Sequence, residues 1–165
     1  MGCDIHCIAE RKESWGWERV YPAPTEREPY YVSAAAEQET NGNYWSWAHA
    51  HAILGWYHAR NYNIFGILAG VRGPEAPITE PRGYPTDLSG EGKHWARRYE
   101  LQGEVGECID IAPGEHSFSW LTVAELQEHE ARLREADPDF TDRVVAALLK
   151  RGKADQVRLV FGFDS

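Results

Sequence analysis

Both ends of the chain alternate apolar and polar residues with a period of two, the pattern of a half-buried β-strand. Residues 3–10 place Asp4 and His6 on one face and two cysteines on the other. The closing segment VRLVFGFDS alternates in the same way. A terminal strand this apolar is stable only when it is paired and covered, so we expect it inside a sheet, with the first strand as a candidate neighbour.

The interior of the chain predicts a hairpin and several helices. WGWERVY, residues 15–21, alternates again and predicts a hairpin with a polar turn around 12–14. Residues 64–69 have helical spacing before Gly70, and less regular helical turns are expected over 35–39 and 45–57.

The last third of the chain predicts two further helices. Thr122 and Glu125 form a capping-box pattern, which predicts a helix from Val123 to about Ala136. A second helix should start near 138 or 142 and end at Gly152. Its inward positions are expected to be Val144, Val145, Leu148 and Leu149.

These elements predict an α+β fold: a mainly antiparallel sheet that contains the N-terminal hairpin and the C-terminal strand, with helices packed on one face. At 165 residues, the whole of 1–165 is expected to be a single domain.

Charge and composition exclude several classes of protein. A net charge of −9 argues against general nucleic-acid binding, which depends on Lys and Arg. No apolar run approaches the length of a membrane span, and the first ten residues lack the order of a signal peptide. Three cysteines without an export signal fit free thiols in a cytoplasmic protein. The oligomeric state stays open.

Asp4 and His6 form the first candidate site. Two residues along a strand span about 7 Å, so both side chains can reach one ligand. A carboxylate and an imidazole suit a divalent metal ion, or an acid/base pair in which the Asp orients the ring. The alternative interpretation is a polar pair on a solvent-facing strand. Zinc bound by Cys3, His6 and Cys7 is disfavoured, because alternation puts His6 on the other face.

A second candidate lies in GEHSFSWLT. His116 is expected in a loop just before a helix, where a histidine is easily positioned for catalysis. Ser117 and Ser119 could donate to an anionic substrate, and Trp120 could contact it. Equally, the two serines could satisfy backbone groups ahead of the helix.

The Gly- and Pro-rich segment 73–92 is expected to be a long loop and a place for ligand contacts. Arg72 and Arg82 bracket its first part, each next to a glycine, and could hold a phosphate or carboxylate. Asp87 is a further candidate contact. Alternatively, Arg82 and Asp87 pair with each other across a surface turn.

Several of these segments together resemble a group of small uncharacterised proteins encoded by bacteriophages and prophages. The similar segments are MGCDIH, NYNIFGILAGVRG, PRGYPTDLS, HSFSWLT and VRLVFGFDS, whereas 15–60 resembles nothing in that group. The resemblance points to Asp4, His6, Arg72, Arg82, Asp87, His116, Ser117 and Trp120. It implies a phage origin and the host cytoplasm, but no reaction. Gly162 stands where that group suggests Trp.

Two function classes follow. The first is a hydrolase, such as a phosphodiesterase, that acts on a small phosphate-containing, nucleotide-like substrate. Its catalytic residues would be Asp4, His6 and His116, with a divalent metal at Asp4 and His6 as an option. The second is a protein that binds and sequesters a small anionic, nucleotide-like host signal without altering it. A structural or protein-interaction module stays open beside them.

Walker A, G-x-S-x-G and G-x-G-x-x-G motifs are absent, which removes common NTPase, hydrolase and dinucleotide-binding classes.

Overall fold

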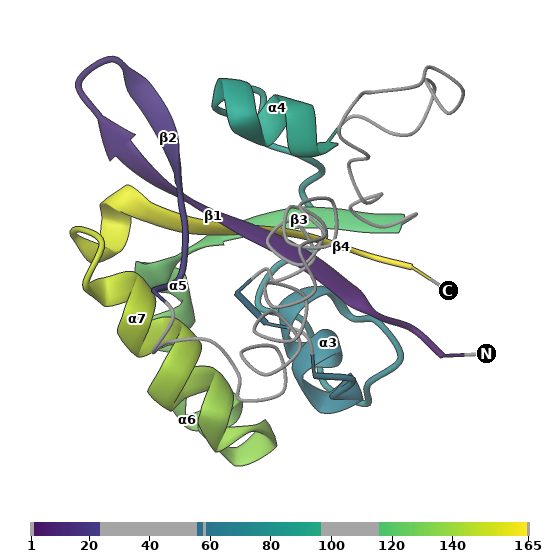
Figure 1. The fold of residues 1–165 in the computed structure, drawn as a ribbon. Coiled ribbons are helices and arrows are strands. Elements are labelled where there is room, and N and C mark those ends of the chain that lie inside the picture. Colours follow the sequence, from purple (N-terminus) through teal and green to yellow (C-terminus); the bar gives the residue numbers. More distant parts are fainter. Residues whose placement is uncertain (1, 24–55, 58, 97–115, 165) are drawn as a thin grey trace, which may run out of the picture.

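A four-stranded antiparallel sheet forms the centre of the protein (Figure 1). The computed structural model describes residues 2–23, 56–57, 59–96 and 116–164, with only the backbone for 94–96. The strand order is β2-β1-β4-β3. The strands are β1 (Ile5–Glu13), β2 (Gly16–Val20), β3 (His116–Thr122) and β4 (Val157–Phe163). The predicted α+β fold with an antiparallel sheet is confirmed, and the last strand lies directly beside the first.

Most helices cover one face of the sheet, and one short helix lies on the other face. Figure 1 shows α3, α5, α6 and α7 on one side and α4 on the opposite side. The helical elements are α3 (Tyr62–Ala69), α4 (Gly90–Ala96), α5 (Val123–Glu128), α6 (Glu130–Ala136), the π-helix η2 (Phe140–Val145), α7 (Ala146–Leu149) and the 3₁₀ turn η3 (Ala154–Gln156). Within the described ranges, no helix has the length and apolar character needed to cross a membrane. The expected turns over 35–39 and nearly all of 45–57 lie outside these ranges.

The main core lies between the sheet and the larger helical layer. Odd-numbered residues of β1, among them Ile5 and Cys7, face this core because side chains alternate along a strand. Phe163 of β4 packs edge-on against Phe65 of α3, with ring centroids 5.0 Å apart. Cys7 and Cys3 are both free and buried. Their thiols therefore act as small apolar groups of the core.

Helix α3 has a side-chain cap at its start and ends at the predicted glycine. The Asn61 side chain accepts hydrogen bonds from the backbone of Asn63 and Ile64, which satisfies two donors at the helix start. Gly70 ends the helix with φ 69°, a left-handed conformation that glycine adopts without a Cβ clash. The helix predicted from the spacing of 64–69 is confirmed.

The two C-terminal helices also agree with the sequence, with two differences. The capping box of Thr122 and Glu125 is present, and α5 begins at Val123 as predicted. The predicted helix is interrupted at His129, after which α6 continues. In the second helix a π-helical stretch widens the turn, which changes the face that later residues present. Leu149, predicted to point inward, is 39% exposed.

The segment HSFSWLT corrects the sequence interpretation of a loop. It forms β3, at the edge of the sheet next to β4. Its register shifts between His116 and Ser119, so that two residues stand opposite one on β4. Such a β-bulge breaks the period-two pattern, which is why alternation did not identify this strand.

On the second face, a buried ion pair joins β1 to β4. The Arg158 guanidinium donates to Glu10 Oε2 from Nε at 2.9 Å and from Nη2 at 2.7 Å. The Glu10 and Arg158 side chains are 0% and 2% exposed. The backbone N–H of Ser89 donates to Glu10 Oε1 at 2.9 Å, which ties the segment before α4 to this pair. Every charge in this buried cluster therefore has a partner.

Asp87 and two tryptophans complete the contacts of Arg158. Arg158 Nη1 donates to Asp87 Oδ1 at 2.8 Å, and Trp17 Nε1 donates to Asp87 Oδ2 at 2.9 Å. The Arg158 Cζ lies 3.8 Å from the Trp17 ring centroid and 5.7 Å from that of Trp120. The guanidinium is therefore surrounded by two aromatic rings, through cation–π contacts, and by two carboxylates.

Replacing Glu10 with Ala should lower the free energy of unfolding by about 3–5 kcal/mol, because it leaves the Arg158 charge buried without its carboxylate. Urea unfolding followed by circular dichroism measures this change. Glu18→Ala is the matched control: Glu18 pairs with Arg11 at 3.4 Å and is half exposed, so its loss should cost about 0–1 kcal/mol. Equal losses for the two variants would contradict a structural role for the buried pair.

Stability should also depend on Asp87 at acid pH. The hydrogen bond from Arg158 holds the pKa of Asp87 below its usual value. The unfolded chain therefore takes up this proton first as the pH falls. The stabilisation from Asp87 is present above about pH 4 and is lost as the pH falls through the lowered pKa of the folded state.

Urea unfolding over a pH series should show a shallower acid dependence for Asp87→Asn than for the wild-type protein. Asp155→Asn serves as the control, since Asp155 is exposed in η3. An unchanged slope in Asp87→Asn would contradict the assigned contact.

Candidate functional site

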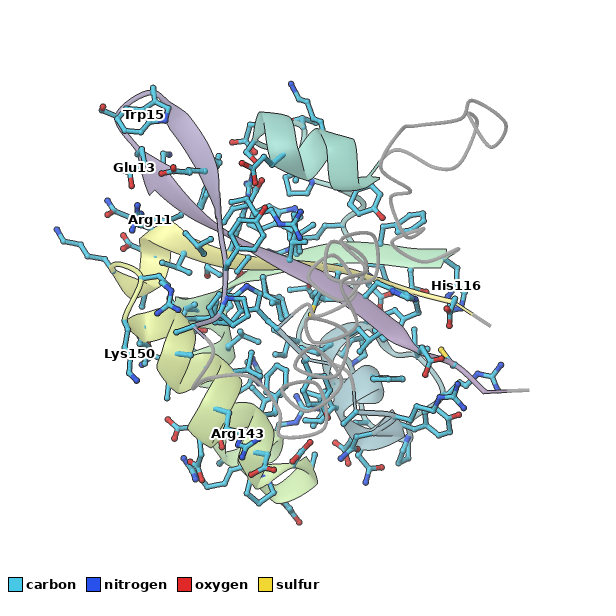
Figure 2. All side chains as sticks on the ribbon, in the orientation of Figure 1. Arg11, Glu13, Trp15, His116, Arg143 and Lys150 are labelled. Atoms are coloured by element: carbon cyan, nitrogen blue, oxygen red, sulfur yellow. The ribbon has the colours of Figure 1, made fainter. Side chains whose placement is uncertain are left out.

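Three strand ends meet at one end of the sheet. β1 and β4 are paired so that His6 stands opposite Gly162 and Ile5 stands opposite Phe163. β3 and β4 are paired so that His116 also stands opposite Phe163. Figure 2 shows His116 at the end of the sheet where both chain termini lie. We call this region the sheet-end site; it comprises Asp4, His6, Arg72, His116, Ser117 and Asp164.

His6 and Asp164 form the closest acid–imidazole contact of the site. The distance from His6 Nε2 to Asp164 Oδ2 is 2.8 Å, and the side chains are 18% and 38% exposed. The other oxygen, Asp164 Oδ1, accepts from the backbone N–H of Asp4 at 2.8 Å. The carboxylate is thus held by both oxygens. When Nε2 donates its proton to Asp164, Nδ1 keeps a lone pair and can accept a proton.

Asp4 has a different partner. The Arg60 guanidinium donates to both Asp4 oxygens, from Nη2 to Oδ2 at 2.7 Å and from Nε to Oδ1. Arg60 is mostly exposed and the Asp4 side chain is 37% exposed. Asp4 and His6 both contact Asp164, Asp4 through its backbone N–H and His6 through its ring. The carboxylate in contact with the imidazole, however, is that of Asp164.

Arg72 adds a positive charge to the same region. Burial raises the pKa of the Cys3 thiol, while the charge of Arg72 and its hydrogen bond to this thiol lower it. Asp164 and Asp4 are also close enough to raise that pKa. Arg72 itself is exposed and has a left-handed backbone, with φ 52°. The Arg72 guanidinium therefore lies beside the Cys3 thiol, which Asp4 and Asp164 also influence, and Arg72 reaches solvent.

His116 and Ser117 form a second polar pair across β4 from His6. The His116 Nδ1 and the Ser117 Oγ are 2.9 Å apart, and the His116 ring stacks on Phe163 with centroids 6.3 Å apart. Because of the bulge, Ser117 and the following residue stand opposite Gly162, which in turn stands opposite His6. His6 and Ser117 therefore lie on the two strands that flank β4 at Gly162.

Other predicted substrate contacts lie elsewhere. Arg82 stacks on Trp120, with its Cζ 4.7 Å from the ring centroid. Its guanidinium donates to the two oxygens of Glu125 at 2.5 Å and 3.1 Å. Its backbone N–H donates to the buried Ser119 Oγ at 3.1 Å. These groups satisfy one another beside α5, and the charge of Arg82 is matched by a carboxylate.

The pKa of Glu125 reflects that contact. Burial would raise it, but hydrogen bonds from Arg82 and from Thr122 outweigh the burial and lower it.

Asp87 lies in the Arg158 cluster described above, paired with Arg158. Glu10 lies four residues along β1 from His6, a distance of about 13 Å between the two positions. The structure thus brings Asp4 and His6 into contact with Asp164 and places His116 and Ser117 at the same end of the sheet, on β3. Arg82, Asp87, Ser119 and Trp120 have their contacts elsewhere.

In the described part of the chain, no group of three or more His, Cys, Asp or Glu side chains is arranged to hold a metal ion. The Nε2 atom of His6, one of the predicted ligands, is within hydrogen-bond distance of a carboxylate. The contact shown at His6 is that between its imidazole and the Asp164 carboxylate.

Asp164 of the sheet-end site, and Gly162 beside it, were not singled out from the sequence as site residues. Asp164 follows the last strand, and Gly162 lies two residues before it on the same face. Both contribute only through the pairing of β4 with β1. Aligning the first and last strands, with Glu10 opposite Arg158, would have placed Asp164 beside His6.

The chain was compared with family models, with curated proteins and with solved structures, and none of the three comparisons found a match.

Proposed function

We propose that the protein is a hydrolase of a small phosphate-containing, nucleotide-like substrate, with His6 as the acid/base at the sheet-end site. The observation that supports this most directly is the 2.8 Å contact between His6 Nε2 and Asp164 Oδ2. A carboxylate held at one ring nitrogen fixes the orientation of the imidazole and its tautomer. The resemblance to phage proteins adds the proposal of a phage origin and of activity in the host cytoplasm.

Arg72 supplies the binding charge in this proposal. Arg72 is exposed, and its guanidinium lies beside the Cys3 thiol, which Asp4 and Asp164 also influence. The two carboxylates alone would repel an anion. A guanidinium can donate two parallel hydrogen bonds to phosphate oxygens. A protein with a net charge of −9 needs such a local cation to hold a phosphate.

In this proposal Asp4 is a positioning residue. Its carboxylate is engaged by Arg60, and its backbone N–H donates to Asp164 Oδ1. Asp4 therefore positions the carboxylate that orients His6, and the proton transfer is assigned to His6 itself.

The proposed reaction moves one proton through His6. The free ring nitrogen removes a proton from a water molecule as its oxygen forms a bond to phosphorus. The bond from phosphorus to the leaving oxygen then breaks, and the imidazolium returns the proton to that oxygen. Asp164 stabilises the positive charge of the ring while it carries the extra proton.

The experiment is incubation of the purified protein with nucleotides and cyclic nucleotides, with and without EDTA, followed by chromatography. Turnover is expected, and His6→Gln should reduce it by about 10²–10⁴-fold, the usual contribution of a general acid/base. The control is His129→Gln, in which a histidine between α5 and α6 is changed. That variant should keep wild-type turnover. Loss of turnover with EDTA would identify a divalent metal as a further component.

Two results would contradict the hydrolase. One is turnover that survives in His6→Gln. The other is stoichiometric binding of a nucleotide that is recovered unchanged, which would support sequestration instead.

A further inference from the structure

We infer that Ser117 is a covalent nucleophile, with His116 as the base that activates it. The inference rests on the proposed hydrolysis of a phosphate compound, and it replaces the direct attack of water on the substrate with attack by Ser117. The Ser117 Oγ lies 2.9 Å from His116 Nδ1, within the range expected for a nucleophile and its base. Both residues are neither fully buried nor fully exposed. A buried structural hydroxyl would be less accessible to a substrate.

The backbone at Ser117 is held in a conformation that is costly for serine. Its φ is 55°, in the left-handed region, at the first residue of the bulge in β3. Glycine is the usual residue at such a bulge position, because it has no Cβ to clash. A side chain kept at a strained position is typical of functional sites, where it holds a reacting atom in place.

The register places this pair opposite His6. Residues 117 and 118 stand across β4 from His6, with Gly162 between them. Neighbouring strands are about 4.8 Å apart, so His6 and Ser117 flank the glycine at a separation of about 10 Å between their backbones. The activated hydroxyl is thus at the same end of the sheet as His6, one strand beyond β4.

The covalent route has two balanced steps. First, Ser117 Oγ forms a bond to phosphorus, its proton passes to His116 Nδ1, and the bond to the leaving oxygen breaks as that oxygen takes the proton. Second, water forms a bond to phosphorus and the Oγ–phosphorus bond breaks. The water proton is taken by His116 Nδ1, which returns it to the serine oxygen as that oxygen leaves phosphorus.

The test uses a tagged alkyl fluorophosphonate, which reacts with activated serine hydroxyls as the Oγ–phosphorus bond forms and fluoride leaves. Mass spectrometry of the intact protein and of its peptides should show one adduct, at Ser117. Ser14, exposed in the hairpin turn, is the internal control for non-specific labelling. His116→Asn should reduce the labelling rate by about 10²–10⁴-fold.

Ser117→Gly is the decisive variant. It removes the hydroxyl and suits the positive φ, so the fold should be at least as stable as the wild type in urea unfolding. Labelling at position 117 and nucleotide turnover should both be lost. An absence of adduct at Ser117 in folded wild-type protein, or labelling of Ser14 at the same rate, would overturn the inference.

The two proposals fail in different ways. Turnover that persists in Ser117→Gly while it is lost in His6→Gln would overturn the serine nucleophile and leave the hydrolase intact. Selective labelling of Ser117 without turnover of any phosphate compound would support the activated serine and overturn the phosphate hydrolase.

Discussion

The pairing of β1 with β4, with the buried charges of Glu10 and Arg158 opposite each other, determines the arrangement of the remaining elements. A shift of one residue in this register would move every side chain of one strand to the other face. Arg158 would then enter the apolar core beside Phe161, and Glu10 would keep its charge without a partner. Such a state is costly, so the ion pair selects one register even where it adds little net stability.

The same register builds the sheet-end site at the other end of these strands. It places Gly162 opposite His6 and brings Asp164 to the imidazole. The bulge in β3 then places Ser117 and the residue after it opposite Gly162. The charges that support the fold and those assigned to chemistry are thus about 13 Å apart along the strands. Substitutions in one set should therefore leave the other set largely unaffected.

Local signals explain which parts of the fold the sequence predicted. Alternation at both chain ends, the Thr122 cap and Gly70 each act within a few residues, and each corresponds to an observed element. β3 was missed because its bulge disrupts the alternation that identifies a strand. Leu149 was misplaced because a π-helix changes the helical period.

The composition of the site depended on contacts between distant residues. The alternation correctly predicted a strand through His6, although β1 begins at Ile5 and Asp4 precedes it. The spacing of Asp4 and His6 contained no information about Asp164, which is 158 positions from His6. Arg82 and Asp87 each appeared suited to a phosphate. Their actual partners, Glu125 and Arg158, are assigned only by tertiary packing.

The most direct test of the sheet-end site is an NMR titration of the isotope-labelled protein with a nucleoside monophosphate. Changes in amide chemical shift should be largest at His6, Gly162 and Ser117, and they should saturate as one site is filled. Saturable changes centred on Arg82 and Asp87, with His6 and Gly162 unmoved, would contradict the account.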